Sequence, residues 1–115
     1  MNQDKTTTAQ VIWGVVNEHG KVVSPAGDST GFSVTNPREG RYEITFNIPY
    51  SSIPAITGNQ VNLHNNGQWD TDGVVFPYVT KEGATVVTGD SGSTSTDPKQ
   101  KNRAFSFFVY GDVPE

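Results

Sequence analysis

The sequence predicts an all-β fold, a single antiparallel β-sandwich or jelly-roll-like domain of seven or eight short strands. The chain has 115 residues with 12 glycines and 7 prolines, so turn-forming residues recur along a length suited to one domain. Large apolar side chains alternate with polar ones in segments spaced about ten residues apart. No segment has a helical apolar stripe or the roughly 20 consecutive apolar residues that span a bilayer, so we expect no membrane insertion.

The predicted domain covers residues 10–111. Residues 1–9 are polar and unpatterned, which indicates a disordered arm, and residues 112–115 are expected to be a C-terminal tail. The first eight residues lack the apolar centre of a secretory signal peptide.

The first two strands are expected on either side of a turn at residues 17–20. Gly20 suits the positive φ that closes a tight hairpin. The strand before the turn, residues 11–16, is apolar on both faces, and the returning strand covers residues 21–23. A loop rich in Pro and Gly follows at residues 24–31.

The clearest strand signal follows an alternating segment at residues 32–35 and a turn at residues 36–40. In residues 41–48, four large apolar side chains recur with a period of two, and they are Tyr42, Ile44, Phe46 and Ile48. On a helix they would scatter around the cylinder, whereas on a strand they share one face. We therefore expect these four side chains to form one wall of the core. Pro49 and Pro54 keep the segment between them out of a central strand.

Three further segments show β character. Alternation predicts a strand over residues 60–64, and a second strand over residues 74–80 carries Pro77, which indicates an edge position or a bulge. Residues 81–83 form a short connection that places Gly83 in a left-handed conformation before a strand at residues 84–88. Residues 89–102 are rich in Gly, Ser and Thr, which favours a long surface loop.

The last strand, residues 103–110, is expected to carry bulky residues on both faces. Phe105 and Phe107 point one way, and Phe108 and Tyr110 point the other. A sandwich has one interior, so such a strand is covered either by a loop or by another subunit. The first strand has the same character, and a homo-oligomer is therefore one of the two expected explanations.

Composition argues against several classes of function. The net charge is −4 and the eight basic residues occur singly along the sequence, which argues against a nucleic-acid partner. The chain has no cysteine, so it has no disulfide, thiolate zinc site or cysteine nucleophile. Its two histidines, His19 and His64, lie too far apart in sequence to suggest a metal site. We predict no metal and no cofactor.

Gly89-Asp90-Ser91-Gly92 spells the nucleophile segment of trypsin-like serine proteases. That chemistry needs a histidine base, an orienting aspartate and a rigid oxyanion hole, which those proteases build from two barrels. The chain is too short for two barrels, and Ser91 lies in a Ser/Thr-rich stretch. We favour a surface loop for this segment and predict that the protein is not an enzyme.

Asp70-Thr71-Asp72-Gly73 matches the start of a calcium-binding loop. The EF-hand pattern has a bidentate Glu at the twelfth position, which is occupied here by Lys81. The segment therefore favours a polar turn, and an irregular calcium site built on Asp70 and Asp72 stays open.

One segment has pronounced ligand-binding character because it combines amides, a carboxylate and an indole. Its candidate residues are His64, Asn65, Asn66, Gln68, Trp69 and Asp70. Planar polar groups hold sugar hydroxyls, and an aromatic ring stacks on the C–H face of a sugar. The alternative, which the residue types favour, is a turn whose Trp69 packs into the core. A sugar site remains the leading functional hypothesis of the sequence.

Several motifs occur in a familiar order, and they are Trp13-Gly14-x-Val16, Gly31-Phe32-Ser33-Val34, Gly40-x-Tyr42-x-Ile44-x-Phe46, Ile53-Pro54-Ala55-Ile56 and Phe105-Ser106-Phe107-Phe108-Val109-Tyr110-Gly111. The pattern resembles small β-sandwich domains of bacterial and phage proteins, of the tail-fibre-head and H-type-lectin-like kind. The resemblance covers residues 12–56 and 104–111. It implies a sandwich, often trimeric, that serves in attachment or glycan recognition at an extracellular or virion surface.

These observations together lead to a functional expectation. We expect a non-enzymatic binding or attachment module, homo-oligomeric with a trimer favoured, that recognises a glycan or another cell-surface group through its loops. The alternative is a purely structural trimerisation or virion and fibre assembly domain.

Overall fold

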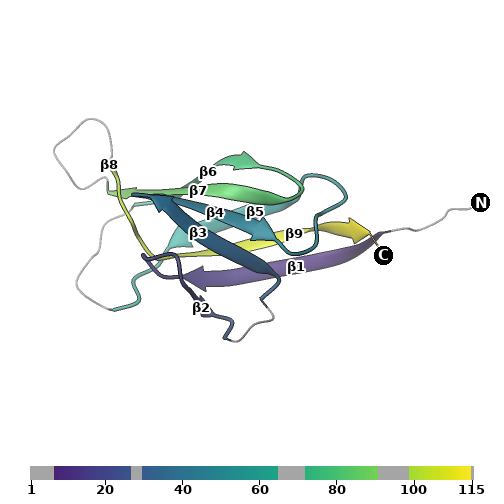
Figure 1. Cartoon of the computed structure of the whole chain (residues 1–115), viewed down its shortest axis with the longest axis horizontal. Helices are drawn as coiled ribbons and strands as arrows, with labels where there is room; N and C mark the ends of the chain where they lie inside the picture. Colours follow the sequence, from purple (N-terminus) through teal and green to yellow (C-terminus); the bar gives the residue numbers. More distant parts are fainter. Residues whose placement is uncertain (1–6, 27–29, 65–71, 91–98, 115) are drawn as a thin grey trace, which may run out of the picture.

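Two antiparallel sheets pack face to face in the computed structural model, which describes residues 7–26, 30–64, 72–90 and 99–114 (Figure 1). The first sheet has the order β2-β1-β9-β5, with bounds Val22–Ser24, Thr7–Val16, Phe105–Pro114 and Ala55–Gln60. The second has the order β3-β4-β7-β6, with bounds Phe32–Arg38, Arg41–Phe46, Gly83–Asp90 and Val74–Val79. The short β8, Lys99–Gln100, pairs with the end of β7. The prediction of an all-β sandwich is confirmed.

The core lies between the sheets and consists largely of the alternating side chains expected from the sequence. Tyr42, Ile44 and Phe46 are buried on β4. Ile48 is 52% exposed, so its predicted inward position is wrong. The ladder alternation ends with β4 at Phe46, and Tyr50 is buried instead, with its ring edge-on to that of Phe46 at 5.1 Å between centroids.

The prediction for Pro77 is confirmed. β6 is an edge strand of the second sheet, and its register with β7 shifts between Val75 and Tyr78. Pro77 lacks a backbone N–H for the ladder, so an edge with a local irregularity accommodates it.

The predicted strand over residues 60–64 is wrong. The strand is β5, which pairs with β9 from Ala55 opposite Tyr110 to Gln60 opposite Phe105. Beyond Gln60, the Val61 N–H donates to the carbonyl of Ala104 at 3.0 Å. The inward positions of β5 include a glycine and a glutamine, so the strand lacks a continuous apolar alternation.

Positive φ angles were predicted for Gly20 and Gly83, and the structure has one at Gly20. Gly20 has a φ of 84°, as expected for the hairpin turn. Gly83 is not among the described glycines with positive φ, so its predicted left-handed conformation is wrong. Gly83 begins β7, where a Cβ atom would overlap the carbonyl oxygen of Ile44. A glycine is required here because the neighbouring backbone approaches closely.

The domain is longer than the predicted range 10–111. β1 starts at Thr7, and β9 continues to Pro114, directly opposite Thr7 in the ladder. Residues 7–9 and 112–114 therefore belong to the sandwich. They pair with each other along the ladder, so they extend the strands without an alternating apolar pattern in residues 7–9. The rest of the predicted arm and tail lies outside the described residues.

Two predicted loops are also shorter. β3 extends to Arg38, which reduces the turn expected at 36–40 to two residues. β7 extends to Asp90, and β8 occupies residues 99–100 within the expected loop at 89–102. Residues 91–98 of that loop lie outside the described part of the chain.

Candidate functional site

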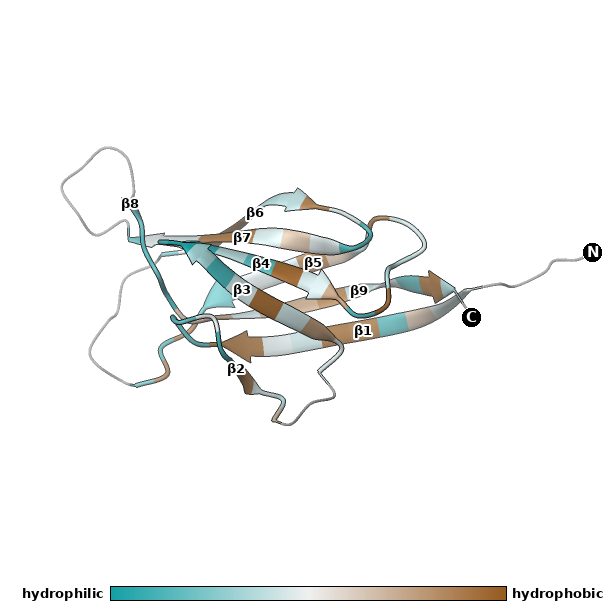
Figure 2. Cartoon of the chain, in the orientation of Figure 1, coloured by the Kyte–Doolittle hydropathy of each residue, from teal (hydrophilic) through white to brown (hydrophobic). Residues whose placement is uncertain are grey.

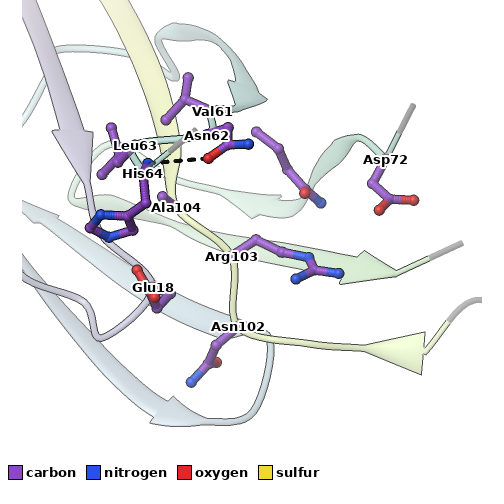
Figure 3. A pocket seen from close by; sticks show the side chains of 10 residues that line it. Glu18, Val61, Asn62, Leu63, His64, Asp72, Asn102, Arg103 and Ala104 are labelled. Atoms are coloured by element: carbon purple, nitrogen blue, oxygen red, sulfur yellow. Dashed lines mark hydrogen bonds between the residues drawn. The ribbon is translucent and has the colours of Figure 1, made fainter. Parts of the chain in front are cut away.

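A cavity of about 190 Å³ lies at the end of the sandwich opposite Thr7 and Pro114. The β1–β2 turn, the end of β5 with the residues after it, the chain before β6 and the chain before β9 meet there (Figure 3). We call it the end pocket. Its polar side chains are those of Glu18, Gln60, Asn62, His64, Asp72, Asn102 and Arg103.

Hydrogen bonds hold the walls of the end pocket together. The Gln60 side-chain amide donates to the carbonyls of Gly73 and Gly89, both at 2.9 Å, and thereby ties the first sheet to the second. The Asn62 carboxamide oxygen accepts from the backbone N–H of His64 at 3.1 Å (Figure 3). These bonds fix the backbone that carries Asn62 and His64.

The end pocket contains groups of opposite charge, among them the Arg103 guanidinium and the Glu18 carboxylate. Arg103 pairs with Asp90, with 3.3 Å between Nη2 and Oδ2. The Tyr42 hydroxyl donates to the Glu18 carbonyl at 2.7 Å and so anchors the turn that carries this carboxylate. Burial raises the pKa of Tyr42 to about 12, so this anchor stays protonated at neutral pH.

The structure places one of the six predicted site residues in this pocket. His64 lies at one side together with Glu18, and Asp72 lies at the opposite side (Figure 3). The other five, Asn65, Asn66, Gln68, Trp69 and Asp70, lie outside the described residues. The sequence analysis did not predict Glu18, Asn102 and Arg103 as site residues. No local signal marks them, because they meet His64 only when β1, β5 and β9 pair.

The described residues form no arrangement that supports the calcium site, the serine nucleophile or a histidine metal site. Asp72 lines the end pocket, but Asp70, its partner in the alternative calcium site, lies outside the described residues, as does Ser91. In the β1–β2 turn, the backbone N–H of His19 donates to the Asn17 carboxamide oxygen at 2.9 Å. Within the described ranges, no group of three or more His, Asp or Glu side chains is positioned to hold a metal ion.

A second candidate surface is the outer face of the first sheet. Trp13 lies opposite Phe108, and Val11 lies opposite Tyr110. Trp13 and Phe108 are each 47% exposed, and the other two are also about half exposed. We call these four side chains the apolar face. Figure 2 shows brown, apolar segments recurring along β1 with paler segments between them.

The apolar face is also nearly free of charge. Counting the outward residues of β1, β9 and β5 that the ladder defines, the one charged side chain is Asp112, near the end of β9. Inward residues of β1 and β9, among them Ile12, Val16, Phe105 and Phe107, are buried. The prediction that the first and last strands are apolar on both faces is therefore confirmed. Across the described residues, no segment buries the apolar face.

Comparisons with family models, curated proteins and solved structures found no match for this chain. The resemblance to tail-fibre-head and H-type-lectin-like domains therefore stays a prediction that depends on the sequence motifs. In the described part of the chain, no helix is long and apolar enough to cross a membrane.

Proposed function

We propose that this chain is a non-enzymatic, self-associating binding module. It assembles through the apolar face, with a trimer as the expected state, and it recognises a glycan or another cell-surface group at the end pocket. The observation that carries the proposal is the exposed, nearly uncharged pairing of Trp13 and Val11 with Phe108 and Tyr110. Aromatic enrichment and depletion of charge are typical of the centres of protein interfaces.

The size of the apolar face supports assembly. An aromatic side chain buries roughly 150–250 Å², so covering three half-exposed rings removes about 300 Å² of surface from water. At about 25 cal/mol per Å², this contributes about 7 kcal/mol before the entropic cost of association. Val11 and the backbone around the rings add to this area. These figures favour a reversible, concentration-dependent assembly.

The end pocket supports ligand recognition. Amide, carboxylate, imidazole and guanidinium groups converge there from four chain segments. Such groups provide both donors and acceptors, as sugar hydroxyls require. The predicted ligand segment begins at His64, on the wall of this pocket.

The solution mass tests assembly. We expect the parent chain to be oligomeric and a Trp13→Ser/Phe108→Ser variant to be monomeric by light scattering. A matched control is Val75→Ser/Tyr78→Ser, which removes two exposed apolar side chains from the second sheet and leaves the mass unchanged. A monomeric parent chain at high concentration would contradict the assembly.

A glycan array tests recognition. We expect the parent chain to bind, and Trp69→Ala and Asn62→Ala to bind more weakly. A parent chain that binds nothing on a broad array would contradict the glycan part of the proposal. Covalent labelling of Ser91 by a serine-directed phosphonate would contradict the non-enzymatic part.

The apolar face also favours a second candidate function, a purely structural assembly domain. Such a domain needs the interface and no ligand. A stable oligomer that binds no glycan would support this alternative over the binding module.

A further inference from the structure

A groove of about 420 Å³ lies on the outer face of the second sheet, away from the apolar face. Residues of β3, β4, β6, β7 and β8 contribute to it. Its polar and aromatic lining residues are Arg38, Arg41, Tyr78, Thr85 and Gln100.

The groove contains two arginines that face each other across the β3–β4 hairpin. Arg38 and Arg41 are register partners, and like charges directly opposite each other on a ladder are destabilising. Glu43 compensates Arg41, with 2.8 Å between its carboxylate and Nε. The same carboxylate accepts from the Thr85 hydroxyl at 2.8 Å. Arg38 has no ion-pair partner among the described residues, so its guanidinium remains available to an anion from solution.

The backbone that carries the two arginines is held both from within the hairpin, by Asn36, and from outside it, by Asn102. The Asn36 side-chain amide donates to the carbonyls of Arg38 and Arg41, at 2.9 and 2.8 Å. The Gly40 N–H donates to the Asn102 carboxamide oxygen at 2.6 Å. A site whose backbone is already ordered loses less conformational entropy when a ligand binds.

Two segments that carry basic residues meet near this groove in a chain of net charge −4. Five of the eight Lys and Arg residues fall within residues 38–41 and 99–103. The two segments are in contact, because a Cβ on Gly40 would meet the backbone of Gln100 and Lys101. The basic residues occur singly in the sequence, and the fold brings these two segments together. Within them, Arg41 pairs with Glu43 and Arg103 pairs with Asp90.

An exposed aromatic ring completes the groove. Tyr78 is 66% exposed on β6 and lines the same groove as the arginines, and Gln100 adds an exposed amide. Guanidinium groups bind carboxylates and sulfates through paired hydrogen bonds. An aromatic ring stacks on the C–H face of a sugar, and an amide bonds its hydroxyls.

We propose that this groove binds an acidic saccharide, with Arg38 contacting its carboxylate or sulfate and Tyr78 stacking on the sugar ring. The site is separate from the end pocket and does not depend on the function proposed above. The arrangement favours a saccharide over a nucleic acid, because one uncompensated arginine in an acidic protein cannot follow a row of phosphates.

The test uses calorimetric titration of the full chain with three oligosaccharides of equal length, one carboxylated (galacturonate), one sulfated (dextran sulfate) and one neutral (dextran). We expect binding to at least one acidic sugar, tenfold or more above the neutral one and weakened by salt. The acidic sugar that binds more tightly identifies the anionic group. Equal affinity for acidic and neutral sugars, or no binding to any, would overturn the proposal.

Three variants locate the site. Arg38→Gln is expected to weaken binding at least tenfold, and Tyr78→Ala several-fold, with unchanged circular dichroism spectra. Lys21→Gln removes the same charge from an exposed position next to β2, in the first sheet, and should leave the affinity unchanged. Equal losses in Lys21→Gln and Arg38→Gln would show a general charge effect and overturn the proposal. So would a single-stranded oligonucleotide that binds as tightly as the acidic sugars.

Discussion

Asn36 and Asn102 exchange amide hydrogen bonds although they lie 66 residues apart in the sequence. The Asn102 Nδ2 donates to Asn36 Oδ1 at 3.1 Å, and the Asn36 Nδ2 donates to Asn102 Oδ1 at 3.3 Å. Asn102 lines the end pocket, and Asn36 holds the backbone of the arginine groove. One pair of amides therefore supports both candidate sites.

Replacing Asn102 with Ala removes this pair and leaves the Gly40 N–H without its acceptor. Losing a partner of a shielded polar group costs about 1–3 kcal/mol, and we expect the free energy of unfolding to fall by this amount. Urea denaturation measures it. Asn47→Ala, at an exposed position, is the matched control and should change stability little. Equal effects of the two substitutions would contradict the structural role of the pair.

The two faces of β9 offer a direct comparison between identical residue types. Phe105 is fully buried, with its ring centroid 5.0 Å from that of Tyr42, whereas Phe108 is half exposed. We expect Phe105→Ala to lower the free energy of unfolding by about 3–5 kcal/mol. Phe108→Ala should cost less than about 1 kcal/mol at low protein concentration and should reduce the solution mass at high concentration. Equal losses of stability would mean that the two faces are wrongly assigned.

A pair of glycines tests the close approach of β4 and β7. Gly83→Ala places a Cβ atom against the Ile44 carbonyl, so we expect a loss of about 1–3 kcal/mol or more. Gly73→Ala meets no atom within 4 Å and should be close to neutral. Thermal denaturation of both variants measures the difference. A stable Gly83→Ala protein would contradict the described register.

Stability should fall in alkaline solution because of Tyr42. Burial raises the pKa of this hydroxyl from 10.0 to about 12, so the folded state holds the proton more tightly than the unfolded state does. The resulting stabilisation is complete below pH 10 and is lost as the pH rises from 10 towards 12. Tyr42→Phe should reduce this alkaline loss, as measured by urea denaturation at pH 8 to 11.

The matched control for this pH effect is Tyr78→Phe, since Tyr78 is an exposed tyrosine. It should leave the alkaline loss of stability as it is in the parent chain. Burial also raises the pKa of Tyr50, so some alkaline loss is expected to remain in Tyr42→Phe. A profile in Tyr42→Phe identical to that of the parent would contradict the assignment.

Local features of the fold were predictable because their causes are local. The alternation of Tyr42, Ile44 and Phe46 requires a strand with one buried face, and the missing N–H of Pro77 requires an edge. Ile48 continues the alternation in sequence, but the ladder ends before it. β5 was displaced in the prediction because its inward residues are only partly apolar, and pairing with β9 determines its position.

The candidate sites were less predictable for the same reason. The sequence predicted His64 as a site residue, and it showed that β1 and β9 are apolar on both faces. It could not show that Glu18, Asn102 and Arg103 line the same pocket as His64, or that Arg38 faces Arg41 in a groove that Tyr78 also lines. These contacts join segments that are distant in the chain.

By itself, the sequence determined the all-β architecture, the strands with two apolar faces and the principal turns. Alternation, proline and glycine act on neighbouring residues, so their effects appear in any short window of the chain. Only the tertiary structure decided which loops form the end pocket and where the basic residues gather. Those outcomes depend on the pairing of β1 with β9 and on the packing of the two sheets, which are interactions between residues far apart in the sequence.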